Sequence, residues 1–153
     1  MERRIITTVS AWPELARELL TKIQPTATAA TCVALSGDLG VGKTTLVQAL
    51  GQTLGIKDAI TSPTFVIQKT YPVTQSGWDQ LVHIDAYRLE DVDELRVLAW
   101  SQTVTSPRTL VCIEWAERIQ GALPPQTWQL TLSIKANGQR LVEIMPPEGN
   151  TTI

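Results

Sequence analysis

The stretch of sequence that decides the fold is Thr31-Cys32-Val33-Ala34-Leu35-Ser36-Gly37-Asp38-Leu39-Gly40-Val41-Gly42-Lys43-Thr44. Its last eight residues, 37–44, match the pattern G-x-x-x-x-G-K-[ST] in full. Residues 31–35, just before the match, are almost wholly apolar, which is typical of a strand buried on both faces of a parallel sheet. A strand, a glycine loop and a helix in this order form a P-loop, whose backbone N–H groups and helix N-terminus bind phosphate.

The rest of the chain alternates apolar runs with helical patterns and predicts an α/β fold. Leu46, Leu50 and Leu54 indicate a helix over about 42–54 that ends at Gly55. Further helices are expected over 10–23, with Ser10 as the N-cap, and after the capping residue Asp91. Further strands are expected at 64–71, 80–85 and 109–113, and a C-terminal hairpin of 128–134 and 140–145 with a type I′ turn at Asn137-Gly138.

If residues 64–71 and 80–85 pair as a hairpin, the sheet is mixed. The sequence therefore predicts a three-layer, P-loop NTPase-like α/β fold with a mixed, mainly parallel central sheet and a C-terminal β-hairpin. A chain of 153 residues suits one domain. We expect this domain to span 1–145, with a loose tail over 146–153 that begins at Pro146-Pro147.

Composition narrows the function classes. A hydrophobic fraction of 43% with 18% charged residues is typical of a globular protein. The net charge of −2 excludes broad electrostatic binding of nucleic acid, so any RNA is expected to be bound indirectly, through partners. No apolar stretch approaches the roughly 18 residues of a membrane helix, and Arg3-Arg4 is not followed by a signal-peptide core. We therefore expect no membrane association and a cytoplasmic location.

The small number of cysteines and histidines limits redox chemistry, zinc binding and nucleophilic catalysis. Cys32 and Cys112 lie in separate apolar runs without a C-x-x-C pair, so we interpret both as reduced core thiols. Two cysteines and one histidine make a four-ligand zinc site improbable. The only candidate base for a nucleophilic triad is His83.

The P-loop defines the expected nucleotide site. Lys43 should reach the β- and γ-phosphates as an exposed loop lysine, and the Thr44 hydroxyl should ligate Mg²⁺. Two acids, Asp85 and Glu114, come where apolar strands end, which is where α/β sheets bind ligands. We expect both to serve catalysis, by holding the metal or orienting the attacking water. The loop residues expected to bind the nucleotide are Asp38, Leu39, Gly40, Val41, Gly42, Lys43, Thr44 and Thr45.

The nucleotide and the reaction class can be narrowed further. No N-K-x-D string for guanine recognition occurs, which favours ATP over GTP. Small-molecule kinases usually carry an arginine-rich lid, and here only Arg118 follows Glu114 closely. A kinase with Asp85 as the base remains an alternative to an ATPase. A second alternative is a module in which ATP is an assembly ligand and its turnover is incidental.

Four strings, in order and spacing, carry a resemblance to a known family. They are GDLGVGKTT at 37–45, SPTF at 62–65, HIDAYRL at 83–89 and IEWAE at 113–117, with GALP at 121–124 as a weaker fifth. Together they resemble the P-loop ATPases of bacterial tRNA threonylcarbamoyladenosine biosynthesis, the TsaE or YjeE family. From the first string to the last they span residues 37–124, somewhat more than half of the chain. At 99–103 the chain reads AWSQT, where the family usually has a glycine and an aromatic, acidic segment.

The resemblance implies a weak ATPase that acts with partners. It implies that Lys43 and Thr44 bind phosphate and Mg²⁺, that Asp85 and Glu114 form the acidic side, and that Thr64 in a switch-like loop contacts the γ-phosphate. The implied partner is the TsaB–TsaD complex, in which TsaD installs threonylcarbamoyl on adenosine 37 of tRNA. ATP turnover would then reset that complex.

Two further residues in these strings, His83 and Trp115, need separate consideration. His83 alternates with Asp85 and Tyr87 along the expected strand, so all three should project to one face. His83 is then either a hydrogen-bonded structural residue or a catalytic one. Trp115 either packs in the core or shields the nucleotide site or a partner surface.

Overall fold

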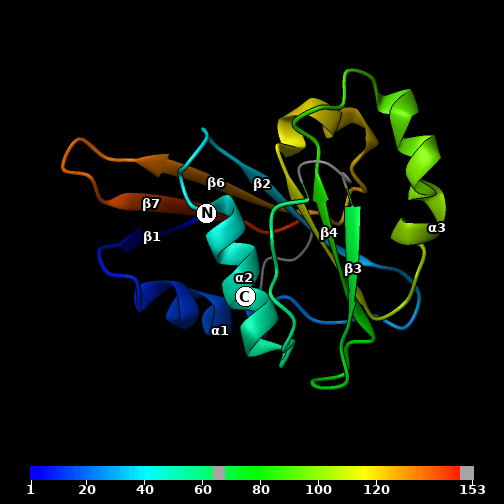
Figure 1. Cartoon of the computed structure of the whole chain (residues 1–153), viewed down its shortest axis with the longest axis horizontal. Helices are drawn as coiled ribbons and strands as arrows, with labels where there is room; N and C mark the ends of the chain where they lie inside the picture. Colours follow the sequence, from blue (N-terminus) through cyan, green and yellow to red (C-terminus); the bar gives the residue numbers. More distant parts are fainter. Residues whose placement is uncertain (64–67, 149–153) are drawn as a thin grey trace.

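Seven strands within the described residues, 1–63 and 68–148, form one sheet in this computed structural model (Figure 1). They are β1 (Glu2–Ile6), β2 (Thr31–Ser36), β3 (Gln68–Pro72), β4 (Gln80–Asp85), β5 (Thr109–Glu114), β6 (Trp128–Ile134) and β7 (Arg140–Met145). The helical segments are α1 (Ala11–Lys22), α2 (Lys43–Thr53), α3 (Trp100–Val104) and the 3₁₀ helices η1 (Val92–Leu98) and η2 (Ala116–Ala122). The order across the sheet is β1-β7-β6-β2-β5-β4-β3.

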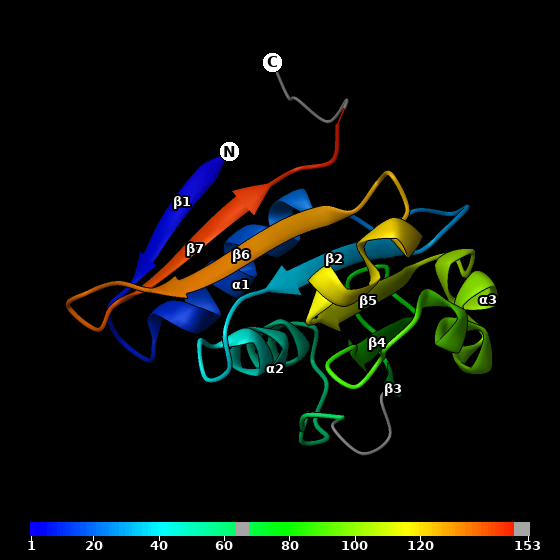
Figure 2. The same cartoon turned by 90° about the horizontal axis from the view of Figure 1, so that it is seen from above.

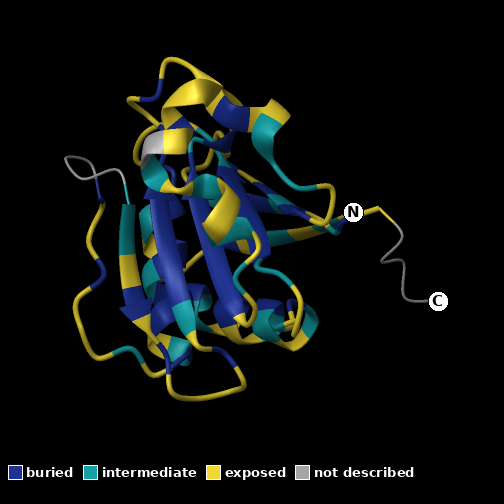
Figure 3. Ribbon diagram, turned by 90° about the vertical axis from the view of Figure 1, so that its right-hand side faces the viewer, coloured by how far each residue is buried: buried dark blue, intermediate teal, exposed yellow. Residues whose placement is uncertain are grey.

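The centre of the sheet is parallel and its margins are antiparallel. Strands β6, β2, β5 and β4 run parallel, whereas β1 with β7, β6 with β7 and β3 with β4 are antiparallel pairs. Strands β2 and β5 are buried along almost their whole length, which explains their continuous apolar sequences (Figure 3). The predicted mixed sheet with a parallel centre and a C-terminal hairpin is confirmed.

Helical segments cover both faces of the central strands and form a three-layer arrangement (Figures 1 and 2). One hydrophobic core packs α1 and α2 against the sheet and includes Leu19 and Leu46. The other core lies beneath η1, α3 and η2 and includes Leu95 and Ile119. Because successive strand residues point to opposite faces, β2, β4 and β5 contribute to both cores.

The two cysteines lie on opposite sides of this sheet. Cys32 on β2 belongs to the core beneath the 3₁₀ helices, and Cys112 on β5 belongs to the core beneath α1 and α2. Both are free and buried, as predicted. Burial raises the pKa of the Cys32 thiol to about 12 and raises the pKa of Cys112 as well.

Three local predictions differ from the structure. Strand β1 was not expected, because its charged sequence ERRII hides its alternation of half-buried and exposed residues. The segment after Asp91 is a 3₁₀ helix, although Asp91 caps it as predicted by accepting a hydrogen bond from the Asp93 N–H at 3.1 Å. Ser10 is the N-cap residue of α1 as predicted, but its hydroxyl makes no capping bond and lies 3.1 Å from the Thr8 hydroxyl.

The turn of the β6–β7 hairpin corrects another prediction. A type I′ turn needs positive φ at both central residues. Gly138 has φ of 84°, whereas Asn137 has no positive φ. The Gly138 N–H donates to the Lys135 carbonyl at 2.9 Å, and the Lys135 N–H donates to the Gln139 carbonyl. The connection is therefore a longer turn that closes with a left-handed glycine.

Two predicted segments lie partly outside the described residues. The strand expected at 64–71 is described only from Gln68, where β3 pairs with β4 as the predicted hairpin. The tail expected at 146–153 is described only to Glu148. No helix among the described residues is both long and apolar enough to cross a membrane.

Candidate functional site

The glycine loop connects β2 to α2, as the P-loop prediction requires. Gly37 and Gly42 both have left-handed φ values, 145° and 117°. A Cβ atom on Gly37 would lie 2.4 Å from the Leu132 carbonyl oxygen, and one on Gly42 would lie 2.6 Å from the Trp12 ring. Both positions therefore need glycine for backbone conformation and for space.

Lys43, the first residue of α2, is buried rather than exposed, and this corrects the sequence-based expectation. Only 4% of the residue is accessible. Its ammonium donates hydrogen bonds to the carbonyls of Gly37 and Asp38, the second at 3.0 Å. The ammonium also lies 4.1 Å from the centre of the Trp115 ring. Burial lowers the pKa of Lys43, and the carboxylate of Glu114 acts in the opposite direction.

Glu114 ends β5 directly opposite the next residue of α2. The Thr44 hydroxyl lies within hydrogen-bond distance of both carboxylate oxygens of Glu114, at 2.8 Å from Oε1 and 2.9 Å from Oε2. On the other side, Nε2 of His83 lies 2.5 Å from Oε2 of Glu114. The carboxylate, whose side chain is only 5% exposed, is thus held between the P-loop helix and β4.

Asp85 ends β4 and stands next to Glu114 in the parallel register of β4 and β5. Its Oδ1 accepts the Tyr87 backbone N–H at 2.9 Å, and its Oδ2 lies 3.4 Å from the Ser62 hydroxyl. The backbone continues this link, because the Ala86 N–H donates to the Glu114 carbonyl at 2.9 Å. Two neighbouring strands therefore present a carboxylate each at the same edge of the sheet.

These groups surround one cleft of about 280 Å³. Two aromatic side chains form part of its wall: the Tyr87 and Trp115 rings lie 4.9 Å apart, and the Arg118 guanidinium lies 5.3 Å from the Tyr87 ring. Trp115 has a left-handed φ of 56°, a strained conformation that is common at functional sites. The lining residues are Leu39, Gly40, Gly42, Lys43, Thr44, Thr45, Ser62, Asp85, Tyr87, Glu114 and Trp115.

Most residues predicted for the site meet at this cleft, with three exceptions. Val41 is 1% exposed and packs in the hydrophobic core, and Asp38 contributes its carbonyl to Lys43. Thr64 lies outside the described residues. Tyr87 lines the cleft without having been given a role, although its alternation with Asp85 in the sequence could have indicated it. Trp115 combines its two interpretations, since it lines the cleft and also packs against the core.

The strand, the glycine loop, the following helix and the paired strand-end acids define a P-loop-type α/β protein. The family model described as "Threonylcarbamoyl adenosine biosynthesis protein TsaE" matches residues 6–142. The chain therefore belongs to the TsaE family.

Individual relatives agree with this assignment. The chain is 42% identical over 102 residues to the tRNA threonylcarbamoyladenosine biosynthesis protein TsaE of Streptomyces coelicolor, covering 66% of this chain and 67% of the relative. It is 40% identical over 125 residues to the protein of the same name from Nostoc, covering 79% and 74%. The crystal structure of Bacillus subtilis YdiB has the same fold, with a TM-score of 0.71 at 23% identity, covering 95% of this chain and 85% of YdiB.

Proposed function

We propose that this protein binds Mg·ATP, hydrolyses it slowly, and thereby supports the threonylcarbamoyladenosine modification of tRNA at adenosine 37. Its direct partner in this proposal is the TsaB–TsaD complex, and tRNA is contacted only through that complex. Family membership supports the biosynthetic role. The proposed nucleotide chemistry depends on the cleft.

The observation that carries the nucleotide proposal is the Thr44–Glu114 hydrogen bond beside a buried lysine. A P-loop protein that hydrolyses ATP needs a cation for the β- and γ-phosphates, a hydroxyl for the metal and a carboxylate to hold metal or water. Lys43, Thr44 and Glu114 supply these three groups within one cleft. The Lys43 ammonium donates to the carbonyls of its own loop.

The donor set suits Mg²⁺. Magnesium binds one or two carboxylates, keeps several waters and takes its remaining ligands from substrate phosphates. The carboxylates of Glu114 and Asp85 lie side by side, and the Thr44 hydroxyl, 2.8 Å from Glu114, is the hydroxyl ligand typical of P-loop proteins. The described residues contain no cluster of three or more His, Cys, Asp or Glu side chains arranged to hold an ion, and Mg²⁺ does not require one. When bound, the ion would neutralise negative charge on the β- and γ-phosphates.

Each of the residues around the cleft would then have a separate role in hydrolysis. Lys43 would exchange its loop carbonyls for phosphate oxygens. Glu114 and Asp85 would orient the attacking water, and the Tyr87–Trp115 pair would limit access of bulk water to the cleft. Thr64 would contact the γ-phosphate, so that the loop containing it reports the nucleotide state to the partner.

A co-purification experiment tests this proposal. The chain is captured on the TsaB–TsaD complex with ATP, with ADP, with a non-hydrolysable ATP analogue and without nucleotide, while phosphate release is measured in parallel. We expect association that depends on the nucleotide, and slow phosphate release by the chain alone. Thr64→Ala should still bind ATP but should reduce the difference in partner affinity between ATP and ADP.

The same experiment separates the alternatives. Equal association under all four conditions would contradict the switch and favour ATP as a constant assembly ligand. Transfer of labelled phosphate to a small-molecule acceptor, rather than its release, would favour a kinase. Lys43→Ala serves as the control that lacks the phosphate contact.

A further inference from the structure

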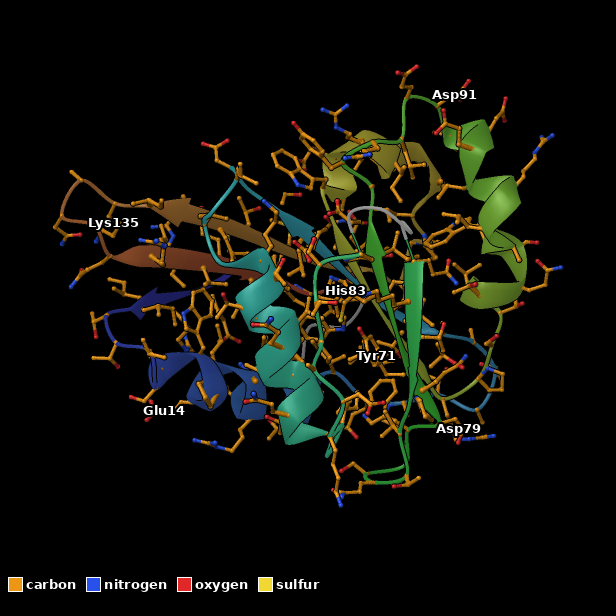
Figure 4. The ribbon with its side chains drawn as sticks, in the orientation of Figure 1. Glu14, Tyr71, Asp79, His83, Asp91 and Lys135 are labelled. Atoms are coloured by element: carbon orange, nitrogen blue, oxygen red, sulfur yellow. The ribbon has the colours of Figure 1, made fainter. Side chains whose placement is uncertain are left out.

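His83 is the single histidine of the chain, and its position is unusual for a residue that only fills space. It is fully buried on β4, between β5 and the edge strand β3 (Figure 4). Its Nε2 atom contacts Oε2 of Glu114 at 2.5 Å. Its Nδ1 atom is buried and has no hydrogen-bond partner among the described residues. An aliphatic side chain would fill this space without burying an unpaired nitrogen.

Glu114 depends on a small number of hydrogen bonds for its orientation. Within the described part of the chain, its carboxylate oxygens bond to the Thr44 hydroxyl and to His83. The Thr44 hydroxyl is the group that the proposed function assigns to the metal. Once the Thr44 hydroxyl binds the metal, His83 is the remaining side chain that holds the Glu114 carboxylate. This carboxylate is too buried for water to orient it freely.

We propose that His83 is a positioning residue for Glu114. In this arrangement the Nε2–H donates to Oε2 and fixes the carboxylate plane, so that Oε1 is free to meet metal or water. The unpaired Nδ1 offers no competing contact among the described residues that would turn the ring. This inference rests on the proposed ATP hydrolysis. Residues that orient a metal or water ligand in this way typically affect activity by about 10- to 100-fold.

Three variants test the positioning role. His83→Gln retains an N–H donor at the far end of the side chain, whereas His83→Leu removes the donor and keeps an apolar volume. Val82→Ala is the matched control: Val82 precedes His83 on β4, is buried, and packs in the core on the other face. We expect His83→Leu to lower kcat for ATP about 10-fold or more with little change in KM, and His83→Gln to restore most of it. Val82→Ala should lose stability but keep its kcat.

A second measurement does not depend on activity. Because the chain has one histidine, ¹⁵N NMR of the nucleotide-free protein reports the His83 imidazole without overlap. We expect the proton on Nε2, and we expect Glu114→Gln to shift the Nε2 signal. Glu143→Gln, on the distant strand β7, should leave it unchanged.

The outcomes distinguish this inference from the function on which it rests. If the wild type released no phosphate from ATP, both would fail. If the wild type hydrolysed ATP and His83→Leu did so equally fast, only the positioning role would be overturned. Equal loss of kcat in His83→Leu, His83→Gln and Val82→Ala would also overturn it, as would a His83 signal that does not respond to Glu114→Gln.

Discussion

The central strands β2, β4 and β5 differ in their burial pattern from the strands β1, β6 and β7 at one end of the sheet. Strands β2, β4 and β5 are buried on both faces, and their carboxyl ends carry the glycine loop, Asp85 and Glu114. Strands β1, β6 and β7, here called the hairpin wing, alternate buried with accessible residues. The wing contributes no residue to the cleft described above.

The difference shows that burial determines how strongly charged side chains are held in each region of this chain. In the centre, two-sided burial removes carboxylates and a lysine from water, so their hydrogen bonds determine their orientation. In the wing, charged residues form solvent-accessible pairs such as Arg3 with Glu143 at 3.3 Å. Such pairs contribute little, because water screens them. Equivalent substitutions should therefore have unequal effects in the two regions.

The largest difference is expected between Lys43→Ala and Lys135→Ala, compared by their affinity for Mg·ATP. Loss of the proposed charged phosphate contacts of Lys43 should weaken Mg·ATP binding by about 1000-fold, since hydrogen bonds to charged groups contribute about 1.5–3 kcal/mol each. Lys135 is exposed in the turn of the wing, and its loss should not change ATP affinity. Titration calorimetry measures both affinities, and melting curves should show that both variants remain folded. Unchanged ATP affinity in Lys43→Ala would remove the P-loop assignment.

Glu114→Gln against Glu143→Gln compares two acids at strand positions. Glu114→Gln should lower kcat about 100-fold while changing ATP affinity much less, because a group that orients metal or water acts mainly in the transition state. Asp85→Asn should do the same or weaken the Mg²⁺ dependence. Glu143→Gln should match the wild type. Phosphate-release kinetics over a range of Mg²⁺ concentrations provide the comparison, and wild-type turnover in both site variants would make the strand-end acids structural.

Gly42→Ala against Gly138→Ala compares the two glycine turns. At Gly42 the added methyl group would lie 2.6 Å from the Trp12 ring in a backbone conformation unfavourable for alanine, so we expect a loss of about 2 kcal/mol. At Gly138 nothing lies within 4 Å of the new Cβ, and only the backbone strain of about 1 kcal/mol remains. Urea unfolding measures both losses. Equal losses would show that the Trp12 ring moves aside without cost.

Glu18→Gln should have the smallest effect. The Arg4 guanidinium on β1 hydrogen-bonds to Glu18 on α1 and lowers the pKa of that carboxyl below its ordinary value of 4.5. A carboxyl with a lowered pKa stabilises the fold above about pH 4.5, and this contribution is lost as the pH falls through the folded pKa. We expect a loss under about 1 kcal/mol at pH 7 that vanishes at low pH. Urea unfolding across pH tests this, and a loss that persists in acid would point to packing instead.

The same contrast explains which parts of the structure the sequence predicted. Continuous apolar runs such as 109–113 mark central strands clearly, because both faces are buried there. Strand β1 was missed, because Glu2, Arg3 and Arg4 look like a charged leader until β7 pairs with them. The pattern at 37–44 predicted the position of the glycine loop. Because α/β sheets bind ligands where their parallel strands end, the sequence also predicted that Asp85 and Glu114 lie near this loop.

What the sequence could not predict in the site depends on tertiary contacts. The burial of Lys43 involves Trp115, which is far along the chain and approaches only when β5 lies beside β2. The bond between His83 and Glu114 likewise depends on the register of β4 against β5. A single sequence without this register leaves His83 between a structural and a catalytic interpretation.

The strand order also has a consequence for synthesis on the ribosome. Strand β2, which leads into the glycine loop, is made early, but its two neighbours, β5 and β6, come from the last third of the chain. Strand β1 can pair only after β7 has been synthesised, because Glu2 pairs with Ile144. Such distant pairings form slowly and only after the later segment has emerged. A nascent chain that ends before β6 is complete at Ile134 would therefore carry an intact glycine-loop sequence, but its strand β2 would lack the neighbour β6. The proposed phosphate binding should then be gained only near the end of translation.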